Sequence, residues 1–394
     1  MTEQVKYNFD AVSDTAGIVT FKRSRYQGKD VLPLWIADME FDTPEVILEA
    51  LRKRLEIPAF GYQGVQESLD EAFASWAAAH YGWQVEKEWL VWVTNLVTGL
   101  DLACEAACQG SGSVLLPTPA YPPMAVAPSF GGGEVIKSPM AKDADGIWRM
   151  DFDAMQKAVR ADTKLLIFCN PQNPTGRVFR LDELRQVIEF CKKNDLLLCS
   201  DDIHGPIVVD PDSKHVPIGM IDPDFADRVI TLTAMTKAFN TQSVGAGVAI
   251  IPNRELRELY RGAQFRYRQV PGALECAAAE ASYRDTTGWV EQLTDYLRGN
   301  LELVRKFVDG KAGLAMSKVE GTYLAWIEVA GLDTIGDVEA FFANHGLGIA
   351  PGAKFGDASH VRLCYACPRP MLVEGLARFD RAISALHRTG EPVG

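Results

Sequence analysis

The chain has 394 residues, of which 47 % are hydrophobic and 23 % charged, and its formal net charge is −12 at pH 7. This composition is typical of a globular protein, and the length is sufficient for two domains. The negative charge argues against nucleic acid or an anionic membrane as a partner, although it leaves room for a local positive pocket. Residues 1–10 lack a signal-peptide pattern, and the longest apolar stretches reach about half of the ~20 residues of a membrane span. We therefore expect a cytoplasmic protein.

The eight cysteines are scattered through apolar segments. In a cytoplasmic protein this distribution indicates buried thiols and not a disulfide framework. Cys364 and Cys367 form a single CxxC pair inside a strand-like run. Because no second pair accompanies it, we favour buried thiols over a metal site and expect no metal.

Helical and strand-like patterns alternate from residue 44 onward, which predicts an α/β fold with a mostly parallel sheet between helices. Continuous apolar runs, which indicate strands buried on both faces, occur at 113–116, 164–169, 196–200, 229–233 and 247–251. Between two of these runs, apolar residues recur at i, i+3, i+4 and i+7, so 182–193 is predicted to be a helix with one face on the sheet.

The pattern changes near residue 285. A long amphipathic segment at 289–308 is followed by a strand-like run at 322–329, and then by a helix, a strand and a final helix. We predict a large domain over 46–284 and a smaller α+β domain over 285–394. Residues 1–45 are expected to form an N-terminal segment that packs on the small domain.

Three of the predicted strands end in polar residues. They are followed by Asn-Pro-Gln-Asn-Pro-Thr-Gly at 170–176, Asp-Asp-Ile-His at 201–204 and Thr-Lys-Ala-Phe-Asn at 236–240. Ligands of open α/β sheets bind beyond the carboxyl ends of the strands. Each segment also has an ordinary explanation, namely a turn, a helix N-cap or a solvated lysine. The order and spacing of all three together favour a binding site.

The residue types in these segments suit a particular chemistry. A carboxylate at a strand end can hold a protonated heterocyclic nitrogen, and it is costly to bury unless it is paired. A desolvated lysine has a lowered pKa and becomes a competent nucleophile or base.

Taken together, these segments resemble the fold-type I enzymes that use pyridoxal 5′-phosphate (PLP), the aspartate aminotransferase superfamily, over essentially the whole chain. The Asn-Pro-x-Asn-Pro-Thr-Gly run is highly specific to that superfamily. Within it, the chain is most similar to the MalY/PatB-type cystathionine β-lyases, which are C–S lyases. The segments that carry this similarity are 8–10, 35–41, 61–62, 200–204, 236–240 and 320–326. The resemblance implies a mostly parallel seven-stranded sheet in the large domain.

The resemblance also implies a PLP site, residue by residue. Lys237 would bind PLP covalently and then move the substrate Cα proton. Asp201 would pair with the ring nitrogen, and Asn173 would donate to the phenolic oxygen with His204 close by. Tyr121 would stack on the ring.

The phosphate and the substrate complete the implied site. The backbone N–H groups of Leu96 and Val97, at a helix N-terminus, and the Thr236 hydroxyl would bind the phosphate. Tyr62 would reach the phosphate and the substrate from a neighbouring subunit, which makes a homodimer with shared active sites the expected state.

The amino-acid substrate would be bound at the opposite end of the site. Arg362 would clamp its α-carboxylate with a two-pronged guanidinium, and Ala37 would lie against it.

The match is incomplete at four places. Residues 94–97 read Thr-Asn-Leu-Val where the family has Pro-Gly-Val-Val, and 240–243 read Asn-Thr-Gln-Ser where the subgroup has Asn-Ile-Ala-Gly. Ala234 stands at a frequent serine position, and Asp202 at a frequent glutamate position. These departures leave the cofactor prediction intact but weaken cystathionine itself as the expected substrate.

The resemblance predicts an α,β-elimination on an S-substituted L-cysteine that releases a thiol, pyruvate and ammonia. An aminotransferase would use nearly the same residues and remains an alternative, as does a decarboxylating or oxidative PLP enzyme acting on a cysteine S-conjugate. A non-catalytic binding protein is disfavoured, because it would not need a complete set of cofactor residues.

Overall fold

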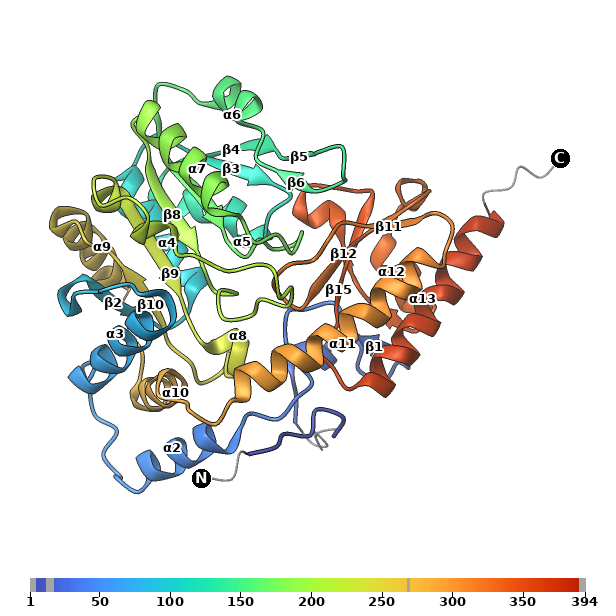
Figure 1. Cartoon of the computed structure of the whole chain (residues 1–394), viewed down its shortest axis with the longest axis horizontal. Helices are drawn as coiled ribbons and strands as arrows, with labels where there is room; N and C mark the ends of the chain where they lie inside the picture. Colours follow the sequence, from blue (N-terminus) through green and yellow to red (C-terminus); the bar gives the residue numbers. More distant parts are fainter. Residues whose placement is uncertain (1–4, 12–17, 268–269, 390–394) are drawn as a thin grey trace.

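The computed structural model describes residues 5–11, 18–267 and 270–389. It contains a seven-stranded sheet enclosed by helices and, beside it, a four-stranded sheet with its own helices (Figure 1). Residues 1–4 and 12–17 of the predicted N-terminal segment, and 390–394 of the predicted C-terminal domain, lie outside the described residues.

The large sheet has the strand order β2-β10-β9-β8-β7-β3-β4. Its members are β2 (Leu90–Val93), β3 (Ser113–Thr118), β4 (Glu134–Pro139), β7 (Thr163–Cys169), β8 (Leu197–Asp201), β9 (Val229–Thr233) and β10 (Gly247–Ile250). All neighbours pair in parallel except β10, which is antiparallel to β2 and β9. The predicted mostly parallel, seven-stranded sheet is confirmed.

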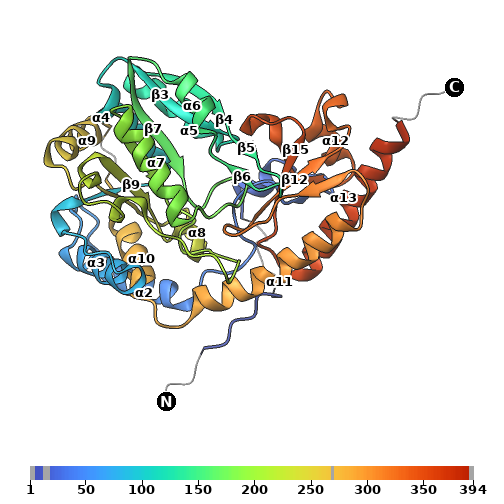
Figure 2. The same cartoon turned by 45° about the horizontal axis from the view of Figure 1, so that its top comes forward.

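Both faces of this sheet are covered by helices, which explains the continuous apolar runs. Along β3, Val114 and Leu116 pack with α4 (Leu96–Cys108) and α9 (Arg254–Tyr267), whereas Leu115 packs on the other face with α7 (Leu181–Lys193). Figure 2 shows α7 in front of the sheet. The helix predicted at 182–193 is therefore confirmed, and it buries the expected face.

The remaining helices of the first 285 residues surround this sheet. Near β2 lie α2 (Glu45–Leu55), α3 (Glu67–Tyr81) and α10 (Ala273–Tyr283), and α10 contacts both of the others. Shorter elements are α1 (Phe21–Ser24), α5 (Pro122–Val126), α6 (Phe152–Ala158), α8 (Thr236–Phe239) and the hairpin of β5 (Ala141–Lys142) and β6 (Trp148–Arg149).

The second sheet is antiparallel, with the order β11 (Leu314–Met316), β12 (Leu324–Val329), β15 (His360–Cys364) and β14 (Ala350–Pro351). It is accompanied by α11 (Trp289–Asp309), α12 (Val338–Asn344) and α13 (Arg369–Thr389). The predicted long helix and strand correspond to α11 and β12. From the N-terminal region, β1 (Leu32–Pro33) pairs with β13 (Leu347–Gly348). The domain boundaries themselves stay a prediction.

The parallel strands bring three polar chain segments to one edge. Cys169 at the end of β7 pairs with Asp201 at the end of β8, and Asp201 pairs with Leu232 of β9. The turn at 170–176, the Asp201 turn and α8 therefore leave the sheet side by side, facing the second sheet.

Within the described ranges, no helix is long and apolar enough to cross a membrane.

Candidate active site

A cavity of about 280 Å³ lies at the carboxyl edge of the large sheet. It is lined by all of the predicted site residues except Tyr62: Ala37, Leu96, Val97, Tyr121, Asn173, Asp201, His204, Thr236, Lys237 and Arg362. Tyr62 is fully exposed, at 109 % of its reference area, and does not line this cavity. One chain thus assembles the predicted site apart from Tyr62.

Lys237 lies on α8, directly after β9, and its Nζ donates to the Ala37 carbonyl over 2.5 Å. Burial lowers the pKa of its amine to about 8, an effect that the nearby carboxylates of Asp38 and Asp201 oppose only in part. A substantial fraction of the amine is therefore neutral near physiological pH. Such an amine can act as a nucleophile and as a base.

Asp201 ends β8, and its Oδ1 accepts a hydrogen bond from the Ile203 backbone N–H at 3.1 Å. Burial, with a smaller contribution from the charge of Asp202, raises the pKa of this carboxyl to about 7. A cationic partner would restore the ionised form. The geometry thus fits a protonated ring nitrogen, which supplies that charge.

Asp202, the second carboxylate, points into a separate buried pair. Its Oδ2 lies 3.2 Å from Nε2 of His215, and Ser200 donates to its Oδ1. The Asn170 side-chain amide donates to Nδ1 of the same histidine over 3.3 Å, so in the neutral ring Nε2 carries the proton. This pair provides the partner that a buried carboxylate requires.

Arg362 reaches the cavity from β15 and is almost fully buried. Its Nη1 donates to Asn173 Oδ1 and its Nη2 to the Trp35 carbonyl, each over 3.0 Å. Its guanidinium also lies over the Phe355 ring, 4.6 Å from the centroid. Burial lowers the pKa of this group to about 10, so the cation persists at neutral pH. A carboxylate ligand suits such a group.

The turn that carries Asn173 is held by its own side chains. Gln172 donates to the Pro119 carbonyl over 2.7 Å and accepts from the Thr175 backbone N–H at 2.9 Å. Asn173 is therefore fixed between this turn and Arg362. His204 is also buried, and burial holds its pKa well below its usual value, so the ring is neutral.

The other end of the cavity has the character of a phosphate site. There α4 begins at Leu96, with Asn95 as its N-cap, and a helix N-terminus presents N–H groups and a positive dipole end. A Cβ on Gly245 would lie 2.2 Å from Thr236 Cγ2, and one on Gly247 would lie 2.4 Å from Leu96. Only glycine at these two positions lets Thr236 and Leu96 pack this closely at the cavity wall.

Gln242 lines the same cavity, and its Nε2 is buried without a hydrogen-bond partner in the described part of the chain. An unpaired buried donor is unfavourable unless a ligand satisfies it. Thr94 and Thr236 add hydroxyl groups to the lining. The donor set of this end therefore fits a phosphate group, as the lysine and carboxylate fit the ring of PLP.

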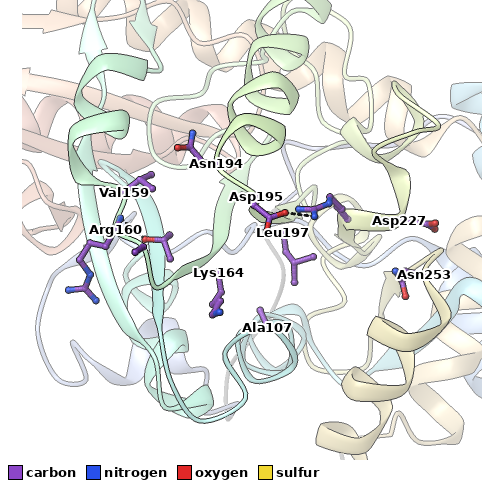
Figure 3. A pocket seen from close by; sticks show the side chains of 12 residues that line it. Ala107, Val159, Arg160, Lys164, Asn194, Asp195, Leu197, Asp227 and Asn253 are labelled. Carbon is purple, nitrogen blue, oxygen red and sulfur yellow. Dashed lines mark hydrogen bonds and ion pairs between the residues drawn. The ribbon is translucent and has the colours of Figure 1, made fainter.

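A larger cavity, of about 630 Å³, lies at the opposite edge of the sheet and contains none of the predicted site residues (Figure 3). Two of its three basic side chains are paired: Arg228 with Asp195, and Arg160 with Asp162 and Glu134. Volume alone therefore does not identify the site. The smaller cavity holds the buried lysine, arginine and carboxylate whose pKa values are shifted.

Several contacts of this site were not foreseen from the sequence. They include the Phe355 ring under Arg362, the Trp35 carbonyl and the His215–Asp202 pair. The first two depend on contacts between distant segments and have no local sequence signal. Gln242 carried a signal, because it departs from the subgroup pattern at 240–243. The cysteines match expectation: all eight are buried free thiols.

Comparisons with known proteins agree with this geometry. A family model described as aminotransferase class I and II matches residues 29–379. Cystathionine beta-lyase PatB of Bacillus subtilis (strain 168) is 29 % identical over 389 residues, which cover 96 % of this chain and 100 % of that protein.

Solved structures are similar over the same extent. The crystal structure of OvoB gives a TM-score of 0.92 at 35 % identity, covering 96 % of this chain and 100 % of that one. The PLP-bound C–S lyase from Staphylococcus hominis gives a TM-score of 0.88 at 31 % identity, covering 96 % and 98 % of the two chains.

The fold and the site together define a PLP-dependent enzyme of fold type I. The chain belongs to the class I and II aminotransferase family, and within it to the group of MalY/PatB-type carbon–sulfur lyases. Pyridoxal phosphate is its cofactor.

Proposed function

We propose that this enzyme cleaves the Cβ–S bond of an S-substituted L-cysteine by α,β-elimination. With one water molecule, the substrate yields a thiol, pyruvate and ammonia. The observation that carries the proposal is that Lys237 and Arg362 line the same cavity. Both also donate to backbone carbonyls of one short segment, Lys237 to that of Ala37 and Arg362 to that of Trp35. An amine able to take a proton thus lies beside a cation able to hold an α-carboxylate.

Substrate binding would depend on Arg362. Its guanidinium is held by Asn173 and Trp35 and supported by Phe355, so its orientation is fixed before the substrate arrives. A fixed guanidinium binds a carboxylate at a lower entropic cost than a mobile one. The α-carboxylate would therefore anchor the amino acid and leave its sulfur substituent directed away from the clamp.

The bound cofactor supplies an electron-poor ring that stabilises negative charge at the substrate Cα. Asp201 would hold the ring nitrogen in its charged form, and this contact would in turn keep the carboxyl ionised. Asn173 and the neutral His204 would lie at the ring oxygen, and Tyr121 would cover the ring face. Each of these assignments rests on the position of the side chain in the cavity and on the resemblance to the family.

The proton steps would belong to Lys237. Its neutral amine would take the proton from Cα, after which the electron pair of the Cα–H bond allows the Cβ–S bond to break and the thiolate to leave. The proton held at Nζ is then available to the departing sulfur. A pKa lowered by burial suits both directions of transfer near neutral pH.

Aminotransfer is the second candidate, because the family model and nearly every cofactor residue are shared with aminotransferases. An aminotransferase would return the proton to the cofactor instead of expelling sulfur, and would need a keto acid to complete its cycle. Thiol formation without a keto acid therefore separates the two reactions. A decarboxylating or oxidative enzyme would instead release carbon dioxide or consume oxygen.

We also propose a homodimer in which Tyr62 completes the site of the partner subunit. The tyrosine lies in an exposed stretch with other exposed apolar side chains, Ile57 and Phe60. Exposed apolar groups gathered in one segment are typical of a protein–protein contact. Because its own cavity does not include it, the tyrosine is available to another chain.

The test of the proposed reaction is an assay of thiol, pyruvate and keto-acid dependence with a set of S-substituted cysteines. Equal amounts of thiol and pyruvate, with no keto acid added, would support the lyase. Conversion of an amino acid only when a keto acid is present would instead identify an aminotransferase.

A further inference from the structure

Lys22 is a buried lysine on an exposed helix. The helix α1 spans only Phe21–Ser24, and Phe21 next to the lysine is 74 % exposed, whereas Lys22 is 3 % exposed. Burying an ammonium group is costly unless it is paired and hydrogen-bonded. The buried ammonium group of Lys22 therefore requires specific hydrogen-bonding and charged partners.

Those partners lie in the segment 35–41. The Lys22 Nζ donates to the Asp38 carbonyl and pairs with Glu40 Oε1, both at 2.8 Å. In return, the Trp35 indole donates to the Lys22 carbonyl over 3.1 Å. The lysine is thus tied to one short segment by side chain and backbone.

The same segment contacts the two cations of the proposed active site. Its Trp35 carbonyl accepts from Arg362, and its Ala37 carbonyl accepts from Lys237. The two adjacent carbonyls have different partners: that of Ala37 accepts from Lys237 at the cavity, whereas that of Asp38 accepts from Lys22.

Asn240 holds the segment from the other side. Its Oδ1 accepts from the Met39 backbone N–H at 3.3 Å, and its Nδ2 donates to the carbonyls of Met39 and Phe41 at 3.3 and 2.8 Å. The peptide unit joining Asp38 and Met39 is therefore bound by Lys22 at its oxygen and by Asn240 at its nitrogen. Asn240 follows α8, which carries Lys237.

The charges around Lys22 fit an anchoring role. Glu40 is shared with the exposed Arg23, 2.5 Å away. The Cys364 thiol of β15 lies 3.7 Å from the Asp38 carbonyl that Lys22 binds. The charges of Lys22 and Lys237 both act to lower the pKa of the Asp38 carboxyl, against the effect of its burial. Lys22 thus joins α1, the 35–41 segment and the strand that carries Arg362.

We propose that Lys22 is a positioning residue that fixes the 35–41 segment, and through it the catalytic lysine and the carboxylate clamp. The inference rests on the proposed roles of Lys237 and Arg362, but not on the choice between lyase and aminotransferase. Loss of the anchor would free the Asp38–Met39 peptide unit to rotate. The Ala37 carbonyl would then lose its fixed orientation toward the cavity.

The test uses the PLP-bound enzyme and two readouts that need no turnover. Visible circular dichroism reports how rigidly the bound cofactor is held, and hydrogen exchange reports the protection of the 35–41 amides. Lys22→Met is expected to lower the dichroism per bound cofactor about twofold or more and to speed exchange in this segment about tenfold. Lys22→Arg is expected to restore most of both. Lys29→Met, which removes an exposed lysine nearby, serves as the control.

If Lys22→Met lowers the melting temperature but leaves both readouts as in the wild type, Lys22 is only a structural residue and the proposal is wrong. A change of equal size in Lys29→Met would overturn it as well. Should Lys22→Met fail to fold, Glu40→Gln tests the same anchor and is expected to act in the same direction with a smaller effect. A wild-type enzyme that binds PLP through Lys237 but releases no thiol from any S-substituted cysteine would refute the proposed function and leave this anchor standing.

Discussion

Arg362 donates a hydrogen bond to Asn173 over 3.0 Å, although 189 residues separate them in the chain. The arginine comes from β15 of the small sheet and the asparagine from the turn after β7 of the large sheet. In the proposed function the first binds the substrate carboxylate and the second the ring oxygen of the cofactor. This hydrogen bond therefore couples the residue that would bind the substrate to a residue that would bind the cofactor.

The first prediction concerns this contact. Arg362→Lys removes the planar fork and the bond to Asn173 but keeps a positive charge. We expect KM for the amino acid to rise about 10- to 100-fold, because a hydrogen bond to a charged group contributes about 1.5–3 kcal/mol. Steady-state kinetics measures this, with the exposed Arg381→Lys as a matched control. An unchanged KM would place the carboxylate elsewhere.

The second prediction concerns the pH dependence of Asp201 without cofactor. Its pKa is raised to about 7 in the folded chain, above its value near 4 in the unfolded chain. The folded state then binds more protons than the unfolded state between pH 4 and 7, so this group costs stability as pH rises through that window. The full cost is present above pH 7.

Asp201→Asn removes that cost. We expect the variant without cofactor to melt about 2–5 °C higher than the wild type at pH 8, with little difference at pH 4. With PLP added the order should reverse, because only the carboxylate can pair with the ring nitrogen. Thermal unfolding at the two pH values, with and without PLP, measures both effects. A lower melting temperature of the cofactor-free variant at pH 8 would contradict the argument.

The sheet was predictable where sequence and burial agree. The apolar runs at β7, β8, β9 and β10 correspond to strands covered on both faces, within one residue or so at each end. The edge strand β4 was missed because only Ser138 of its six residues is buried, so its pattern is mixed. The strand β2, Leu90–Val93, was also not predicted, although all four of its residues are buried.

The site was predictable as far as residues follow strand ends. Asp201 is the last residue of β8, and Asn173 and Lys237 each lie four residues beyond the end of a strand, so the parallel pairing of β7, β8 and β9 brings their segments together. The contacts of Lys22 and the ring of Phe355 depend on the packing of segments far apart in the chain, for which one sequence gives no signal. The roles of Lys22 and Phe355 follow from their contacts in the folded chain.

The third prediction concerns the phosphate end of the site. Gln242 has a buried Nε2 with no partner in the described residues, and Ala234 lacks the hydroxyl that the family often has. We expect Gln242→Leu to weaken PLP binding about tenfold or more, through loss of a hydrogen bond to a charged group. Equilibrium dialysis or protein fluorescence measures the dissociation constant. Ala234→Ser in the same background should recover part of the loss, and unaltered affinity in Gln242→Leu would contradict this role.

The fourth prediction tests whether Tyr62 crosses a dimer interface. Tyr62→Ala and Lys237→Ala are each expected to be inactive as separate homodimers. Co-expressed chains would form mixed dimers in which one site combines Lys237 of one chain with Tyr62 of the other. Random pairing predicts recovery of about a quarter of wild-type activity. Activity that stays absent in isolated mixed dimers would place Tyr62 in the site of its own chain, or in none.

The most direct test of the central claim is one experiment on the purified enzyme and on Lys237→Ala. The visible absorbance of bound PLP is recorded before and after addition of an S-substituted L-cysteine, and thiol and pyruvate are assayed in the same sample without a keto acid. We predict a lysine-dependent visible band that is lost in Lys237→Ala, and equal amounts of thiol and pyruvate from the wild type only. A wild-type band that changes with the amino acid while no S-substituted cysteine yields thiol would contradict the lyase, and an unchanged band in Lys237→Ala would contradict the role of the lysine.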